Sequence, residues 1–235
     1  MTGDAKQDAW DEAYRRGDNF LFYPNEEVVR FFARHIAKRT GITEVSFRDG
    51  FSSSSRVLDF GCGIGRHVRF LLDLTLDAEG IDLSSEAVAV GRRWLAGDGY
   101  PDAAGRLTAG DGRALPYPDA SFDVAVSHGV LDSMPFDMAL ACIADLARVV
   151  RPGGLFYLDL ISGDDSDCTP GFAGEMVVEK AHERGTVQSY FDEAKIGRLL
   201  AGRFAVRELV LVRRAVLNPP NHGSRFHIVA ERLPG

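Results

Sequence analysis

Apolar residues near the start of the chain follow a helical spacing. The spacing covers residues 8–16 and 26–38, and the second range places four apolar side chains on one face: Val28, Val29, Phe32 and Ile36. Pro24 and Asn25 stand just before that range, where helices commonly begin. The pattern predicts two N-terminal helices ahead of the main fold.

The central part of the chain alternates short apolar runs with amphipathic segments. Residues 57–60 follow the polar run 52–55 and are typical of a buried parallel strand. Further elements alternate after them: strands over 78–81, near Leu107, over 122–127 and over 155–161, with helices over 64–72, 85–95 and 136–150. This βαβ succession predicts an α/β fold, a Rossmann-like and mostly parallel sheet with helices on both faces.

The end of the chain has a different pattern. A helical stretch over 192–201 precedes two strand-like runs, 206–212 and 226–231, which the turn-rich residues 218–223 join. This pattern predicts an antiparallel C-terminal hairpin at the edge of the sheet.

Composition narrows the classes of protein and partner. A chain of 235 residues with 45% apolar and 26% charged residues is typical of one folded domain. The formal net charge is −7, so the excess of Lys and Arg that nucleic-acid binders need is missing. No apolar run approaches the roughly 18 residues of a membrane span, and residues 1–10 lack an apolar signal core. We therefore expect a cytoplasmic protein with a small-molecule substrate and neither a nucleic-acid nor a membrane partner.

The three cysteines give no sign of a disulfide framework or a metal site. Cys62, Cys142 and Cys168 are odd in number and contain no closely spaced pair. We expect each to fill apolar space and expect no metal.

A glycine-rich loop follows the first central strand. Residues 59–65 read DFGCGIG, and Gly61 and Gly63 lack the Cβ atom that would keep a ligand away from the backbone. The spacing is G-x-G-x-G, whereas the dinucleotide fingerprint G-x-G-x-x-G places a pyrophosphate at a helix N-terminus. The loop therefore favours a ligand without phosphates.

An acidic residue closes the next strand. Asp82 lies about 20 residues after the glycine loop, where such folds hold the hydroxyl groups of a ribose. The alternative is that Asp82 only caps the helix that begins at Ser84 or Ser85.

Four motifs occur in a fixed order along the chain, and together they resemble one family. They are VLDFGCGIG, GIDLS, AGDGRALPYPDASFDVAVSHGVL and LARVVRPGGLFYLDL. This set is similar to the motifs of class I S-adenosylmethionine-dependent methyltransferases. The resemblance implies a seven-stranded sheet whose last strand is antiparallel, with residues 1–50 as N-terminal helices and lid and 51–235 as the methyltransferase domain.

The resemblance also implies roles in binding S-adenosyl-L-methionine. Gly61 and Gly63 would pack against its methionine part, Asp82 beside Leu83 would hold the ribose, and Asp59 would order the loop. Asp111 would accept from the adenine amino group, and Gly112 would donate its N–H. The alternative for Asp111 is an ordinary Asp-Gly turn, while residues 151–154 (RPGG) predict a type II turn without a chemical role.

Methyl transfer depends on alignment of the acceptor, the methyl carbon and the sulfur, so a strong acid–base motif is not required. His128 at a strand end is a candidate general base, unless its backbone matters more than its ring. Asp132 and Ser133 stand where many family members have Glu-His, which leaves their role open. Arg66 and His67 either shape the start of the loop helix or contact the cofactor carboxylate or substrate.

An aromatic segment, residues 17–24, resembles the lids of small-molecule methyltransferases. Tyr14 and Tyr23 are candidates to bind the cofactor or the acceptor, and Phe20 and Phe22 would exclude water; alternatively, the aromatics anchor the helix to the core. We expect Tyr23→Phe to weaken binding or turnover with little loss of stability.

Two later segments, 163–190 and 217–224, are expected to face the substrate. Tyr190, His182 and His222 are their polar aromatic candidates, although a histidine in a loop is often only a surface residue. The sequence thus predicts a methyltransferase, with oxygen favoured as the acceptor atom. The alternatives are an NAD(P)-dependent oxidoreductase and a non-catalytic S-adenosylmethionine-binding module.

Overall fold

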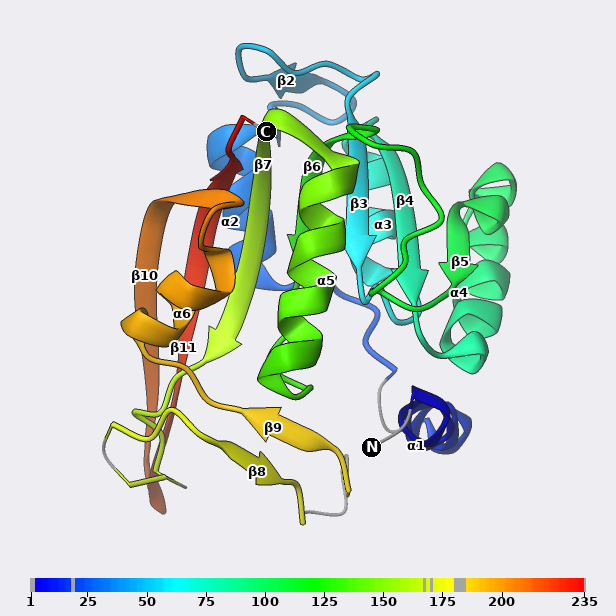
Figure 1. Cartoon of the computed structure of the whole chain (residues 1–235). Helices are drawn as coiled ribbons and strands as arrows, with labels where there is room; N and C mark the ends of the chain where they lie inside the picture. Colours follow the sequence, from blue (N-terminus) through cyan, green and yellow to red (C-terminus); the bar gives the residue numbers. More distant parts are fainter. Residues whose placement is uncertain (1–2, 18–19, 167, 170, 180–184, 235) are drawn as a thin grey trace.

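A seven-stranded sheet forms the centre of the protein (Figure 1). The structure is a computed structural model that describes residues 3–17, 20–166, 168–169, 171–179 and 185–234. The strand order is β10-β11-β7-β6-β3-β4-β5. The bounds are β3 (Arg56–Phe60), β4 (Asp77–Asp82), β5 (Leu107–Ala109), β6 (Phe122–Ser127), β7 (Val150–Ile161), β10 (Phe204–Leu217) and β11 (Pro220–Arg232).

The five central strands are parallel, and β11 is antiparallel to both β7 and β10. Helices α5 (Phe136–Val149) and α6 (Glu193–Leu200) cover one face of the sheet, where their apolar side chains pack against those of β6 and β7. Helices α2 (Glu26–His35), α3 (Arg66–Asp73) and α4 (Ser85–Gly97) cover the other face. These observations confirm the Rossmann-like fold with helices on both faces and an antiparallel C-terminal hairpin.

The N-terminal elements differ in part from the prediction. Helix α1 (Gly3–Arg16) and α2 form, but the expected extension of the second helix to residue 38 is wrong. Ile36 leaves the helical conformation with φ −124° and ψ −68°, and residues 37–39 form β1 (Ala37–Arg39), which pairs with β2 (Val45–Phe47). Strands of three residues are too short to show a period in the sequence.

The C-terminal hairpin is longer than its apolar runs suggested. β10 and β11 pair from Phe204–Arg232 to Leu217–Pro220, so residues 213–217 and 220–224 are paired strand residues rather than a loop. Most of β10 is exposed on both faces, which removes the apolar–polar alternation that marks a half-buried strand.

Three further elements complete the chain. The short helix η1 (Pro101–Arg106) precedes β5. Residues 151–154, predicted as a turn before a strand, lie within β7, and Gly153 has the φ of +75° that the third position of a type II turn requires. A small hairpin of β8 (Glu175–Val177) and β9 (Val187–Ser189) lies within residues 163–190, a segment expected to face the substrate. None of the helices in the described part of the chain has the length and apolar character of a bilayer crossing.

Candidate cofactor site

A cavity of about 300 Å³ lies at the carboxyl ends of β3, β4, β5 and β6. It brings together eight of the ten residues predicted for the site: Tyr14, Gly61, Gly63, Asp82, Leu83, Asp111, Gly112 and His128. Such a position agrees with the rule that parallel sheets bind ligands beyond the carboxyl ends of their strands. Asp59 and Tyr23 do not line it.

The glycine loop forms one wall of the cavity in a conformation that other residues rarely adopt. Gly61 and Gly63 have φ +74° and +56°. A Cβ atom on Gly61 would lie 2.2 Å from Val130 Cγ2, and one on Gly63 would lie 2.6 Å from the Tyr14 hydroxyl oxygen. The loop is therefore tightly enclosed by its neighbours, and its backbone borders the cavity.

Asp82 contacts both the glycine loop and the start of α4, and it lines the cavity. Its Oδ2 accepts the N–H of Gly63 at 2.8 Å, and its Oδ1 accepts the N–H of Ser84 at 2.8 Å. Ser84 is itself the N-cap of α4, because its Oγ accepts the N–H of Ala87. The carboxylate thus fixes the glycine loop against α4 and also lines the cavity.

Asp111 also lines the cavity, and it is paired with a neighbour in the sequence. Its Oδ1 accepts the backbone N–H of Arg113 at 2.9 Å, and both carboxylate oxygens lie 3.0 Å from Arg113 Nε. This geometry supports the turn interpretation of the Asp-Gly pair. Gly112 packs so closely that a Cβ atom would lie 2.3 Å from Phe60 Cζ.

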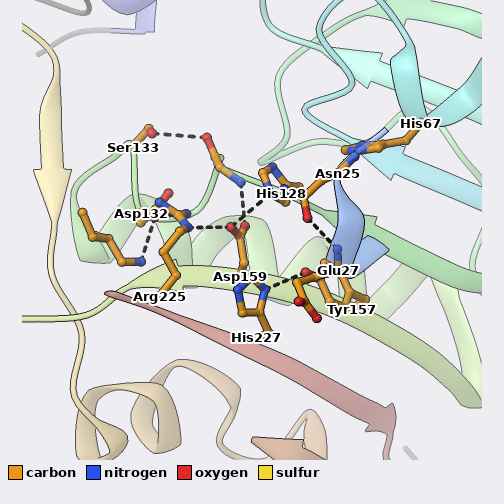
Figure 2. Close-up of polar contacts among 12 residues, drawn as sticks. Asn25, Glu27, His67, His128, Asp132, Ser133, Tyr157, Asp159, Arg225 and His227 are labelled. Carbon is orange, nitrogen blue, oxygen red and sulfur yellow. Dashed lines mark hydrogen bonds and ion pairs between the residues drawn. The ribbon is translucent and has the colours of Figure 1, made fainter. Parts of the chain in front are cut away.

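Asp59 is buried next to the glycine loop, and its carboxylate faces the ring of His67. Its Oδ1 lies 3.5 Å from His67 Nδ1, while His67 Nε2 accepts the backbone N–H of Asn25 at 3.3 Å. Since Nε2 is the acceptor, the proton is on Nδ1 and faces Asp59. His67 therefore joins the start of α2 to the start of α3 (Figure 2). Arg66 and His67 both line the cavity as well, so a contact with the cofactor or the substrate stays a prediction.

His128 is held from both sides. Its Nδ1 lies 3.2 Å from Arg66 Nη2, and its Nε2 lies 3.5 Å from Asp159 Oδ2. A guanidinium can only donate, so Nδ1 is the acceptor and Nε2 bears the proton. Burial lowers the pKa of His128 to about 4, which keeps the ring neutral near pH 7. Because both nitrogens are engaged, the contacts favour a positional role over the predicted one as a general base, which stays a prediction.

An ion-pair cluster next to His128, formed by two buried carboxyl groups and the partly exposed Arg225, was not predicted as part of the site. Arg225 on β11 donates from Nε to Asp159 Oδ2 at 2.7 Å and from Nη2 to Asp132 Oδ2 at 2.5 Å (Figure 2). Burial raises the pKa of Asp132, whereas Arg225 and His128 hold the pKa of Asp159 below its usual value despite its burial. The sequence did contain a signal for Asp159, because it is a charged residue inside the apolar run 155–161.

Residues of the N-terminal segment line part of the cavity, and its role as a lid stays a prediction. Trp10 and Tyr14 of α1 and Leu21 line it, and Phe22 packs edge-on against Trp94 with 5.1 Å between ring centroids. The side chain of Tyr23 instead points outward with 84% of its surface exposed, and only its carbonyl contacts Arg66. The structure therefore does not bring the predicted Tyr23 hydroxyl to the site.

Two of the polar aromatic candidates for the substrate side, Tyr190 and His222, do not line the cavity. Tyr190 is buried against Phe172, with 5.4 Å between ring centroids, and His222 lies on the C-terminal hairpin with its Nε2 3.0 Å from Arg213 Nη2. His182 lies outside the described residues.

A family model described as "Methyltransferase domain" matches residues 57–154, which include the glycine loop, Asp82, Asp111 and His128. The chain is 29% identical over 160 residues to a sterol 4-C-methyltransferase of Caenorhabditis elegans, covering 64% of this chain and 44% of that protein. It is 32% identical over 158 residues to a malonyl-[acyl-carrier protein] O-methyltransferase of Enterobacter lignolyticus, covering 66% of this chain and 57% of that protein. The chain thus spans about half the length of these curated relatives.

Solved structures show the same fold. A methyltransferase from Methanosarcina mazei aligns with a TM-score of 0.65 at 22% identity, covering 78% of this chain and 95% of that one. The 1,6-didemethyltoxoflavin-N1-methyltransferase of Burkholderia thailandensis, solved with its substrate and S-adenosylhomocysteine, aligns with a TM-score of 0.63 at 18% identity, covering 97% and 87%.

The cavity suits an adenosyl ligand that carries no phosphate. Its wall offers close-packed glycine backbone and the Asp82 carboxylate, and Arg66 is the single Arg or Lys among the described residues that line it. A pyrophosphate would call for more donors than one guanidinium and a G-x-G-x-x-G loop, which this chain lacks. The ordered motifs, the strand order and the matching domain model together support a class I S-adenosylmethionine-dependent methyltransferase.

Proposed function

We propose that the protein transfers a methyl group from S-adenosylmethionine to a small-molecule acceptor, with oxygen as the acceptor atom. The observation that carries this proposal is the Asp82 carboxylate, fixed by the Gly63 N–H beside the glycine loop in one cavity. The bound cofactor supplies an electrophilic methyl carbon. The protein supplies binding, alignment and a site closed to water.

Each part of the cavity suits one part of the cofactor. Asp82 would accept from the ribose hydroxyls, and Asp111 with the Gly112 N–H would hold the adenine edge. Backbone of the glycine loop would pack against the methionine part. Arg66 would bind the carboxylate of the methionine part. It lines the cavity, and its contacts with His128 and the Tyr23 carbonyl are with neutral groups.

The contacts of His128 support a methyl acceptor that does not need a strong general base. His128 is neutral, and its two nitrogens already contact Arg66 and Asp159. A carboxylate oxygen is nucleophilic without deprotonation, so alignment is sufficient for its methylation. Two relatives carry names of this kind, the malonyl-[acyl-carrier protein] O-methyltransferase and a fatty-acid O-methyltransferase of Mycolicibacterium smegmatis.

Calorimetric titration with S-adenosylhomocysteine, S-adenosylmethionine and NAD tests the cofactor. We expect the two adenosyl compounds to bind and NAD to give no heat. Asp82→Ala should weaken the binding of S-adenosylhomocysteine by about tenfold or more, because a hydrogen bond to a charged acceptor contributes roughly 1.5–3 kcal/mol. The matched control is Asp77→Ala at the other end of β4, which should bind like the wild type. Full affinity in Asp82→Ala would contradict the proposed binding mode.

The alternatives give different results in the same experiments. Binding of NAD alone would support an oxidoreductase. Mass spectrometry of reactions with a panel of carboxylic and hydroxylated compounds then tests catalysis. Tight binding of S-adenosylhomocysteine without any methylated product would support a non-catalytic binding module.

A further inference from the structure

Asp159 lies at the junction of three elements of the site. It is buried near the end of β7, with 1% of its surface exposed. Its Oδ1 accepts the Gly129 N–H at 2.7 Å, and its Oδ2 faces both Arg225 Nε at 2.7 Å and His128 Nε2 at 3.5 Å (Figure 2). One carboxylate thus holds two consecutive residues that line the cavity, His128 and Gly129.

The contact with His128 fixes more than the position of the ring. A carboxylate beside Nε2 favours the tautomer whose proton is on Nε2, and this leaves the Nδ1 lone pair free to accept from Arg66. If the proton were on Nδ1, the ring would present an N–H to the guanidinium and repel it. Asp159 therefore acts on Arg66 through the His128 ring.

Acidic and basic side chains alternate along this path. Asp132, Arg225, Asp159 and Arg66 follow one another, with the neutral His128 between the last two. Arg225 contacts both carboxyl groups, but of the two only Asp159 also faces His128 and, through that ring, Arg66 at the cavity. A purely structural Asp–Arg pair would not require these further contacts.

We infer that Asp159 is a positioning residue of the cofactor site, which sets the His128 tautomer and thereby orients the Arg66 guanidinium into the cavity. The ligand that Arg66 would then contact rests on the proposed function. The orientation of His128 does not, so it can be tested without any ligand.

Nitrogen-15 NMR of the histidine rings tests the tautomer. In the wild type at pH 7, the ring signal that disappears in His128→Gln should show a protonated Nε2 and an unprotonated Nδ1. In Asp159→Asn, we expect a mixture of the two tautomers. A wild-type ring that is protonated on Nδ1 or on both nitrogens would overturn the inference, and this result does not depend on whether the variant folds.

Binding of S-adenosylhomocysteine tests the path from Asp159 to Arg66. We expect Asp159→Asn and Arg66→Gln each to weaken binding about tenfold, and the double variant to be no weaker than Arg66→Gln alone, because residues on one path couple. The matched control is Asp123→Asn. Asp123 also accepts one backbone N–H and one Arg Nε, but it lies near the start of β6, outside the cavity lining.

Two results in the binding experiment would overturn the inference: wild-type affinity in Asp159→Asn, or a hundredfold loss in the double variant, which would show that the two residues act separately. If the wild type bound no S-adenosylhomocysteine, the proposed function would fail, and the NMR result would still decide the role of Asp159.

Discussion

The protonation state of His128 shows how a single residue depends on its surroundings. In a loop exposed to water, a histidine would be partly charged near pH 6.5. Burial, together with His67 and Arg66 nearby, outweighs the attraction of Asp159 and lowers the pKa of His128 to about 4. The ring is therefore a neutral acceptor for Arg66 rather than a cation that would repel it.

This state predicts a pH dependence of stability. Between about pH 6.5 and 4 the unfolded chain binds a proton at His128 while the folded protein does not, so the free energy of unfolding falls as the pH falls. The contribution lost by pH 4.5 is about 2–3 kcal/mol. Urea unfolding at pH 7.5 and pH 4.5 should show a larger loss for the wild type than for His128→Gln. Equal losses would show that His128 is not buried in its neutral form.

Among the elements, the β8–β9 hairpin is held against the loop that follows β6. The Ser189 N–H donates to the carbonyl of Asp132 at 2.7 Å, and Gln188 Nε2 donates to the same oxygen at 2.8 Å. Lys195 of α6 anchors the residues on either side of this hairpin, because its Nζ donates to Ala173 O at 3.0 Å and to Tyr190 O at 2.8 Å. Burial lowers the pKa of Lys195.

Loss of the Lys195 ammonium should loosen this hairpin. Lys195→Met keeps the apolar stem but leaves buried carbonyl oxygens without their donor, which costs about 1–3 kcal/mol. We expect faster proteolysis within residues 163–190, measured by mass spectrometry of the fragments, and a lower melting temperature. Lys38→Met on β1 replaces an exposed lysine and is the control. A cleavage pattern like that of the control would contradict the anchoring role.

At the scale of the molecule, the N-terminal segment and the sheet form the cavity together. Asp11 of α1 accepts from the Ser84 hydroxyl at 2.5 Å, so α1 is tied to the N-terminus of α4 next to Asp82. Trp10 and Tyr14 on either side of Asp11 in the sequence line the cavity. The placement of α1 therefore decides how well the cavity is covered.

Asp11→Ala should weaken the cover while the core stays intact. We expect S-adenosylhomocysteine to bind about threefold to tenfold more weakly. The lost hydrogen bond contributes about 1 kcal/mol to the docking of α1 over the cavity, and binding of the ligand depends on that docking. Titration calorimetry measures the affinity, and thermal unfolding should show a small change. Asp8→Ala, an exposed position on the same helix, is the control and should bind like the wild type.

The order of the elements and the glycine loop follow from the sequence alone because their signals are local. Residues 56–161 alternate strand and helix patterns within short windows, and Gly61, Gly63 and Asp82 lie at fixed distances from strand ends. Since parallel strands end at one edge of the sheet, these residues meet in one cavity whatever the surrounding side chains are.

Only the tertiary structure decided the contacts between distant segments. Asp159 and Arg225 are 66 positions apart and become partners because β7 and β11 are neighbours in the sheet. The outward direction of Tyr23 and the pairing along the exposed β10 were likewise set by what packs against them. Periodicity reports which face of an element is buried, but not which partner covers that face, and the protonation state of His128 depends on that partner.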